Sequence, residues 1–229
     1  GTGEILYAAD KGGNEIDHLY LRKADGTVQD LTPAPKEKAN FFGWSQDKKA
    51  LYYISNKRDE RFFDLYKMGV GDWKATLLYQ NNEGYDIAGL SWDEKAVALN
   101  KNITTSENQL FLYGLDSKKM TEISEPGKKG IYGASGFSKD GKAFYYLSNA
   151  DKEFQSLEQY SLADGKRKDV FSTTWDVMYA YDSENEKYRV LAINADGKNE
   201  LKVIDNKSGQ EVALPEIPDG DVTAVSIST

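Results

Sequence analysis

The chain has 229 residues, of which 39% are hydrophobic and 29% are charged, with a net charge of −8 at pH 7 and no cysteine. This acidic balance argues against a nucleic-acid partner and against an anionic membrane surface, because both require a basic face. The lack of cysteine excludes disulfides and thiolate metal sites, and no apolar run approaches the roughly 18 residues that membrane insertion of a helix needs.

The first part of the chain predicts three strands. Residues 5–9, 18–21 and 28–31 are rich in aromatic and branched apolar side chains. The Asp25-Gly26 pair before the third of them supplies the positive φ that a tight hairpin turn needs. We expect these segments to be the second, third and fourth strands of a four-stranded sheet that lacks its first strand.

A repeated segment then dominates the sequence. Each copy contains a strand that ends in serine, a polar turn with Asp or Gly, and a second strand of aromatic and branched residues. The copies begin at Gly43, Gly89, Gly136 and Ala180, so their spacings are 46, 47 and 44 residues. A repeat of this length with four strand signals is typical of one propeller blade, and no window shows the 3.6-residue period of a helix.

We therefore predict an all-β fold, a β-propeller of about five four-stranded antiparallel blades that forms one domain over residues 1–229. The blades are expected at residues 4–31 together with 221–228, 40–79, 86–124, 132–171 and 175–214. In this arrangement the C-terminal strand pairs with the N-terminal blade and closes the ring. The alternative is an open arc of blades, whose exposed apolar faces would favour a dimer.

Four longer strings, at residues 5–15, 55–66, 78–86 and 175–181, resemble the N-terminal propeller domain of prolyl oligopeptidase family serine peptidases. The resemblance is in particular to the bacterial acylaminoacyl-peptidase and dipeptidyl-peptidase-like branch. In that family a larger propeller precedes an α/β-hydrolase domain with a Ser-Asp-His triad and restricts access to it. The resemblance therefore implies two partners, the hydrolase domain of a parent peptidase and the peptide substrates of that parent.

Because the chain is shorter than such a peptidase, the resemblance implies an accessory module without its catalytic domain. The blade repeat by itself is also similar to that of Tol-system periplasmic propellers, so the alternative is a free-standing binding propeller that interacts with other proteins. The sequence does not decide between the bacterial periplasm and the cytoplasm. Its first residues read as a strand and not as a signal peptide.

The motifs of catalysis and metal binding are missing. A serine hydrolase needs Gly-x-Ser-x-Gly and a histidine base, whereas the nearest string, Gly133-Ala134-Ser135-Gly136, has the wrong spacing. His18 is the only histidine and lies in a strand, so we expect it to be structural or exposed. The acidic run at 182–186 lacks the glycine and the final glutamate of a calcium loop and predicts a turn. We expect no catalytic residue, no metal and no cofactor.

The loops between the second and third strands of the blades are the candidate functional surface. They are all polar, and blade symmetry would bring them to one face, where they could contact a hydrolase domain or gate substrates. Arginine and aromatic side chains dominate interface energetics, which favours the cluster at residues 58–63. The candidate residues are Asp10, Asn14, Glu15, Asn56, Arg58, Arg61, Phe62, Asn149 and Glu153. The competing interpretation is that these loops are ordinary solvent-exposed connections.

Overall fold

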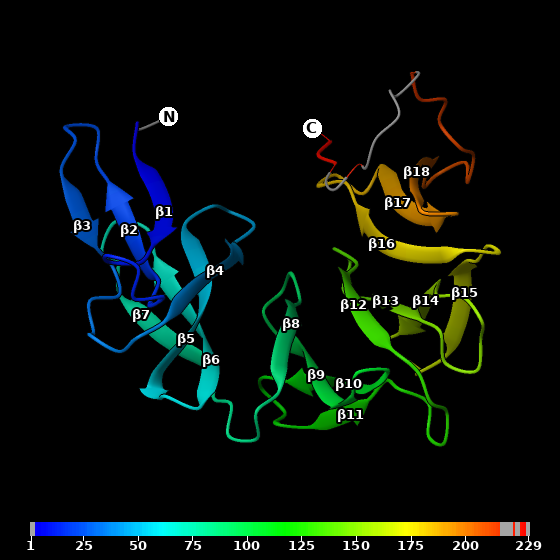
Figure 1. The fold of residues 1–229 in the computed structure, drawn as a ribbon, viewed down its shortest axis with the longest axis horizontal. Helices are drawn as coiled ribbons and strands as arrows, with labels where there is room; N and C mark the ends of the chain where they lie inside the picture. The colour runs from blue at the N-terminus through cyan, green and yellow to red at the C-terminus, as the bar shows by residue number, and fades with distance from the viewer. Residues whose placement is uncertain (1–2, 216–221, 223–224, 228–229) are drawn as a thin grey trace. The chain divides into compact units, whose positions relative to one another are not determined.

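The computed structural model describes residues 3–215, 222 and 225–227, and every regular element among them is a β-strand. Five antiparallel sheets of three or four strands follow one another along the chain (Figure 1). This confirms the predicted all-β fold built from propeller blades. The chain forms two compact units, Gly1–Ile87 and Ala88–Thr229.

The first unit contains two sheets. Blade 1 has the strand order β1-β2-β3, and blade 2 has the order β4-β5-β6-β7. The strands are β1 (Ile5–Ala9), β2 (His18–Arg22), β3 (Val28–Asp30), β4 (Ala39–Trp44), β5 (Ala50–Asp59), β6 (Phe62–Gly69) and β7 (Ala75–Tyr79). Leucines of β2 share one apolar cluster with residues of β5 and β6 in the next blade, and this core of the unit includes Leu19, Leu21, Leu51, Tyr53, Tyr66 and Met68.

The second unit contains blades 3, 4 and 5, and its boundary falls within the first strand of blade 3. Blade 3 comprises β8 (Asp86–Leu90), β9 (Ala96–Thr104), β10 (Glu107–Gly114) and β11 (Met120–Glu122). Blade 4 comprises β12 (Tyr132–Phe137), β13 (Ala143–Ser148), β14 (Ser156–Ser161) and β15 (Arg167–Phe171), and blade 5 comprises β16 (Asp176–Asp182), β17 (Tyr188–Ala195) and β18 (Lys198–Asp205). One apolar cluster joins blades 3 and 4 and another joins blades 4 and 5, because a single blade cannot bury its faces alone.

One hydrogen-bond pattern shapes the turn after the first strand of blades 2 to 5. In blade 2, the Ser45 hydroxyl donates to Asp47 at 2.8 Å and accepts from the Ala50 N–H at 2.9 Å, while Asp47 accepts from the Lys49 N–H at 3.0 Å. The same pattern recurs at Ser91 and Asp93, Ser138 and Asp140, and Ser183 and Asn185. These local bonds explain why the serine and the Asp or Asn recur in the sequence.

The two terminal sheets have three strands each. Half of the predicted closing strand at 221–228 lies outside the described residues, and its described members, Val222 and residues 225–227, are not in a strand. The backbone carbonyls of Val222 and Val225 accept hydrogen bonds from Asn199 and Tyr181 of blade 5. Pairing of this segment with blade 1 therefore stays a prediction. After β18, a single bridge between Ile204 and Glu211 stands where a fourth strand of blade 5 was expected.

Candidate functional site

The β5–β6 hairpin carries the strongest sequence candidates, and Arg58 in it is bound to its own blade. Its Nε donates to Oδ2 of Asp64 at 2.7 Å, and its Nη2 donates to Oδ1 at 2.9 Å. The side chain of Asp64 is completely buried, whereas that of Arg58 is 29% exposed. Burial, followed by the charge of Asp64, raises the pKa of the neighbouring Tyr66 to about 12. The Arg58 guanidinium thus neutralises the buried Asp64 carboxylate and ties the last part of β5 to β6.

Asn81 completes this network and was missed by sequence reasoning. It is 1% exposed, its N–H donates to Asp64 at 2.7 Å, and its carbonyl accepts from Arg58 at 2.6 Å. Its side chain accepts from the N–H groups of Gly84 and Tyr85 and donates to two backbone carbonyls. The Asn-Asn-Glu-Gly string around it indicates a turn, but nothing in that string identifies Asp64 as its partner.

Arg61 and Phe62 lie at the exposed end of the same hairpin. The Arg61 side chain is 75% exposed and forms two hydrogen bonds with Asp59, at 3.0 and 2.7 Å. Hydrogen bonds from the Arg61 side chain, and then from its N–H, hold the pKa of Asp59 well below its usual range. The guanidinium lies 5.0 Å from the centre of the Phe62 ring. This preorganised cation over an aromatic ring has the chemistry of an interface anchor.

Asn56 and Asn149 perform the same structural task in blades 2 and 4. Oδ1 of Asn56 accepts from the N–H of Lys38 at 2.7 Å, and the Asn56 N–H donates to the Lys38 carbonyl at 3.3 Å. Asn149 makes the same two bonds to Ile131, also at 2.7 and 3.3 Å. Each asparagine therefore clips the residue before the first strand of its blade to the second strand, from within β5 in blade 2 and from just after β13 in blade 4. We call this pair of bonds the asparagine clip.

The remaining candidates divide between loop structure and exposed surface. In the β1–β2 loop, Asp10 accepts from the N–H of Glu15, and Asn14 accepts from the N–H groups of Lys11 and Ile16. Asp10 and Asn14 thus shape their own loop. Glu15 and Glu153 are exposed.

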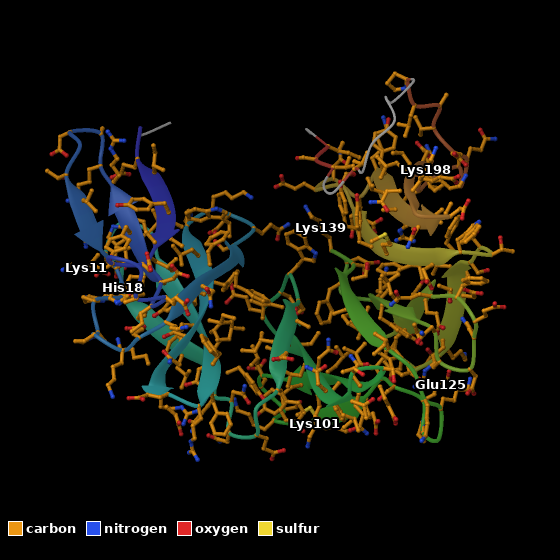
Figure 2. The ribbon with its side chains drawn as sticks, in the orientation of Figure 1. Lys11, His18, Lys101, Glu125, Lys139 and Lys198 are labelled. Atoms are coloured by element: carbon orange, nitrogen blue, oxygen red, sulfur yellow. The ribbon has the colours of Figure 1, made fainter. Side chains whose placement is uncertain are left out.

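The residues that could suggest catalysis have structural partners. Nδ1 of His18 (labelled in Figure 2) lies 2.8 Å from Asp30, and its ring stacks on Tyr20. Ser135 lies in a strand, not in the strand-to-helix turn of a hydrolase nucleophile, and its hydroxyl donates to the carbonyl of Ala180. Asp182 is the last residue of β16, and a turn follows it, so the turn predicted at 182–186 is confirmed except at Asp182. Among the described residues no group of three or more His, Cys, Asp or Glu could hold a metal ion, and no helix could cross a membrane.

The second unit also holds a pocket that the sequence did not predict. It measures about 260 Å³, and Arg189 on its wall pairs with Asp182 through two bonds of 2.8 Å. The Arg189 guanidinium also lies 4.2 Å from the centre of the Tyr145 ring. Glu186 accepts from the N–H of Lys139 at 2.6 Å. These charged groups therefore join blades 4 and 5.

Comparison with known proteins places these blades in a family. The model described as the prolyl oligopeptidase N-terminal β-propeller domain matches residues 3–229. The chain belongs to the prolyl oligopeptidase family. The part of that family that it represents is the propeller, as the sequence strings implied.

One curated relative shows how much of a whole family member this propeller represents. Dipeptidyl aminopeptidase BIII of Pseudoxanthomonas mexicana is 26% identical over 234 residues, an alignment that covers 96% of this chain and 32% of the relative. The chain thus spans about a third of the length of that peptidase.

Solved structures confirm the fold. A prolyl endopeptidase structure matches with a TM-score of 0.67 and 17% identity, over 94% of this chain and 34% of that one. TolB of Acinetobacter baumannii matches with a TM-score of 0.65 and 17% identity, over 91% of this chain and 51% of that one. At this identity the two likenesses show the propeller fold alone.

Proposed function

We propose that this propeller is the non-catalytic module of a serine peptidase, which contacts an α/β-hydrolase domain and restricts the entry of large substrates. The observation that carries the proposal is the family match over residues 3–229. In agreement with it, every strand among the described residues belongs to one of the five blades. The relative named as a dipeptidyl aminopeptidase supports the same function.

The structural roles of the candidate catalytic residues support a non-catalytic module. The single histidine is paired with Asp30 and stacked on Tyr20, and Ser135 is bound to a backbone carbonyl. A nucleophile needs an adjacent base and a third group that orients it. Under this proposal the chemistry comes from another domain of the parent protein.

Arg61 and Phe62 are the contact residues that we favour for the hydrolase domain. Unlike Arg58, whose guanidinium is bound within the blade, Arg61 is largely exposed and is already held over an aromatic ring. Preorganised side chains lose little conformational entropy on binding, which makes them effective anchors.

The alternative is a free-standing interaction propeller of the TolB type. The likeness to TolB concerns the fold, so it does not favour this function over the first. The two functions differ in the domain encoded downstream of the propeller in the parent gene. A peptidase requires a downstream domain with Gly-x-Ser-x-Gly, whereas a free-standing propeller does not.

Activity measurements on the 229-residue chain and on the parent protein test the proposal. We expect the chain alone to leave dipeptide chromogenic substrates intact, and the parent protein to cleave them in a reaction that serine-directed inhibitors stop. Inhibitor-sensitive turnover by the chain alone would contradict the proposal. So would a native protein whose intact mass leaves no room for a second domain.

Gating is tested in the parent protein with Arg61→Glu combined with Phe62→Ala. We expect a several-fold rise in kcat/KM for long peptides relative to dipeptides, because a loosened domain contact admits larger substrates. Lys168→Glu on the outer strand β15 is the matched control and should leave the ratio unchanged. An unchanged kcat/KM ratio in the double variant would show that Arg61 and Phe62 do not belong to the domain contact.

A further inference from the structure

Glu37, in the link between β3 and β4, is a buried acid with one unused oxygen. The residue is 2% exposed, and its Oε1 accepts a hydrogen bond of 2.8 Å from the Ser55 hydroxyl. Its Oε2 is buried and has no hydrogen-bond partner among the described residues. Buried carboxylate oxygens without partners are costly and rare in native proteins. This oxygen is therefore an acceptor that none of the described residues uses.

Glu37 also lines a pocket of about 390 Å³ within the first unit. The other lining residues come from its own link and from the end of β5 and the turn after it: Ala34, Pro35, Lys36, Asn56, Lys57 and Glu60. Ala34 and Pro35 contribute an apolar wall. Lys36 and Glu60 form an ion pair of 2.9 Å, so they neutralise each other. The unbalanced charges at the pocket are those of Glu37 and Lys57.

One oxygen of the carboxylate and the backbone on both sides of Glu37 are held in place. Ser55 holds its Oε1, and the N–H of Glu37 donates to the carbonyl of Ala34 at 2.9 Å. The next residue, Lys38, is held by the asparagine clip from Asn56. A carboxylate fixed in this way loses little entropy when a ligand binds.

We propose that this pocket binds a primary alkylammonium group, the head of a lysine side chain from another polypeptide. Oε2 of Glu37 accepts a hydrogen bond from the ammonium, and the methylene stem lies against Ala34 and Pro35. An ammonium is a compact cation that needs one strong acceptor, whereas a guanidinium binds best to two carboxylate oxygens. A calcium ion needs at least six oxygen ligands, whereas the only side chains with oxygen in this lining are those of Glu37, Asn56 and Glu60.

A titration of the full 229-residue chain tests the proposal, with amide chemical shifts recorded by NMR. The probe is Nα-acetyl-lysine N-methylamide, and the matched control is the norleucine analogue, which lacks the ammonium. We expect saturable shifts at Glu37, Lys38 and Asn56 with the lysine probe, at a Kd on the order of millimolar, and none with the control. Equal shifts with both probes, or no saturable shift with the lysine probe, would overturn the proposal.

Two variants assign the binding to Glu37. Glu37→Gln keeps the acceptor for Ser55 but removes the charge, and it should weaken the lysine probe at least tenfold. Lys57→Gln removes the competing cation and should tighten binding about twofold at low salt, an effect that high salt screens. If Glu37→Gln does not fold, the Lys57→Gln variant and the norleucine control still test whether the pocket binds the ammonium group.

Two further outcomes would also overturn the proposal. If only the Lys57→Gln protein binds the probe, the occupant of the wild-type pocket is Lys57 of the chain itself. If alanine N-methylamide, which carries an α-ammonium without a stem, binds as tightly as the lysine probe, the apolar wall plays no part. These results would show that the pocket does not recognise a lysine side chain from another polypeptide.

Discussion

Blades 2 and 4 carry the same asparagine clip, yet the residue before the clipped one differs completely. Both clips have bonds of 2.7 and 3.3 Å. In blade 2 the preceding residue is Glu37, whose buried side chain bonds to Ser55. In blade 4 it is Gly130, where a Cβ would lie 2.8 Å from the Cα of Ala150.

The difference shows which position varies between blades that otherwise share the clip. The backbone geometry of the clip is the same in both blades, because one asparagine satisfies one N–H and one carbonyl at the edge of each sheet. The adjacent position is free to carry either a buried acid or a close backbone approach. The proposed lysine site in blade 2 occupies this variable position.

Blade 3 carries an asparagine of a different kind. Asn100 lies in β9, two residues before the position that corresponds to Asn56 and Asn149, and its Oδ1 is buried without a hydrogen-bond partner among the described residues.

The largest expected effect comes from the charged pair that distinguishes blade 2. Asp64→Ala should lower the free energy of unfolding by about 3–5 kcal/mol, because it leaves Arg58 and the Asn81 N–H without their buried acceptor. Urea denaturation measures this loss. The double variant Asp64→Leu with Arg58→Met should recover the part of the loss that comes from Arg58, whereas the Asn81 N–H still lacks its acceptor. A loss below about 1 kcal/mol in Asp64→Ala would show that the network is dispensable.

Gly130→Ala should destabilise the chain by about 2–3 kcal/mol, since its Cβ meets the backbone of Ala150 and its φ of +158° disfavours a side chain. Gly133→Ala in the same blade is the control. There the nearest atom to an added Cβ is 4.0 Å away, so we expect little change. Thermal unfolding of the two variants should therefore differ clearly, and similar melting temperatures would refute the close approach.

Loss of the clip should cost the same in both blades. Asn56→Ala and Asn149→Ala should each lower the free energy of unfolding by about 1–2 kcal/mol, because each leaves a backbone N–H without its partner. Asn100→Ala, at an asparagine outside the clip, should cost clearly less, since the Oδ1 of Asn100 has no hydrogen bond to lose. Chemical denaturation of the three variants in parallel measures this. A cost in Asn100→Ala equal to the other two would contradict the comparison.

Introducing glycine and removing glycine at the same position of the repeated turns should have opposite effects on stability. Lys48, Glu94 and Glu186 have φ values of 59°, 57° and 53°, and Gly141 holds the same turn position with φ 68°. Glycine at Lys48 or Glu94 should stabilise the chain by about 0.5–1 kcal/mol, because it removes the strain of a left-handed conformation. Gly141→Ala should destabilise by a similar amount, and melting temperatures that shift in the same direction would refute this explanation.

The smallest effect concerns acid stability. Hydrogen bonds from Lys142 and Ser138 lower the pKa of Asp140 to about 2, from 3.8. A carboxylate with a lowered folded-state pKa stabilises the protein above its unfolded pKa, and this contribution is lost as the pH falls from about 4 to about 2. Asp140→Asn should therefore reduce the loss of stability across this range, measured by denaturation at each pH. Asn185 occupies the same place in blade 5, so Asn185→Asp should have the opposite effect.

The sequence by itself determined the all-β fold, the repeated blades and the turn after each first strand. These features depend on alternating strands and on bonds between residues two to five positions apart, so one stretch of chain contains the whole signal.

Only the tertiary structure decided which polar residues are available for function. The sequence favours Arg58 as a contact residue, whereas the structure shows it bonded to Asp64 and to the distant Asn81. Nothing in the sequence distinguishes Glu37 from the other acidic residues, of which the chain has 37 in all. Burial and pairing depend on residues from other strands and loops, which short-range pattern does not specify. The physical reason is that a buried charge is defined by its three-dimensional surroundings, whereas a strand or a turn is defined largely by its neighbours along the chain.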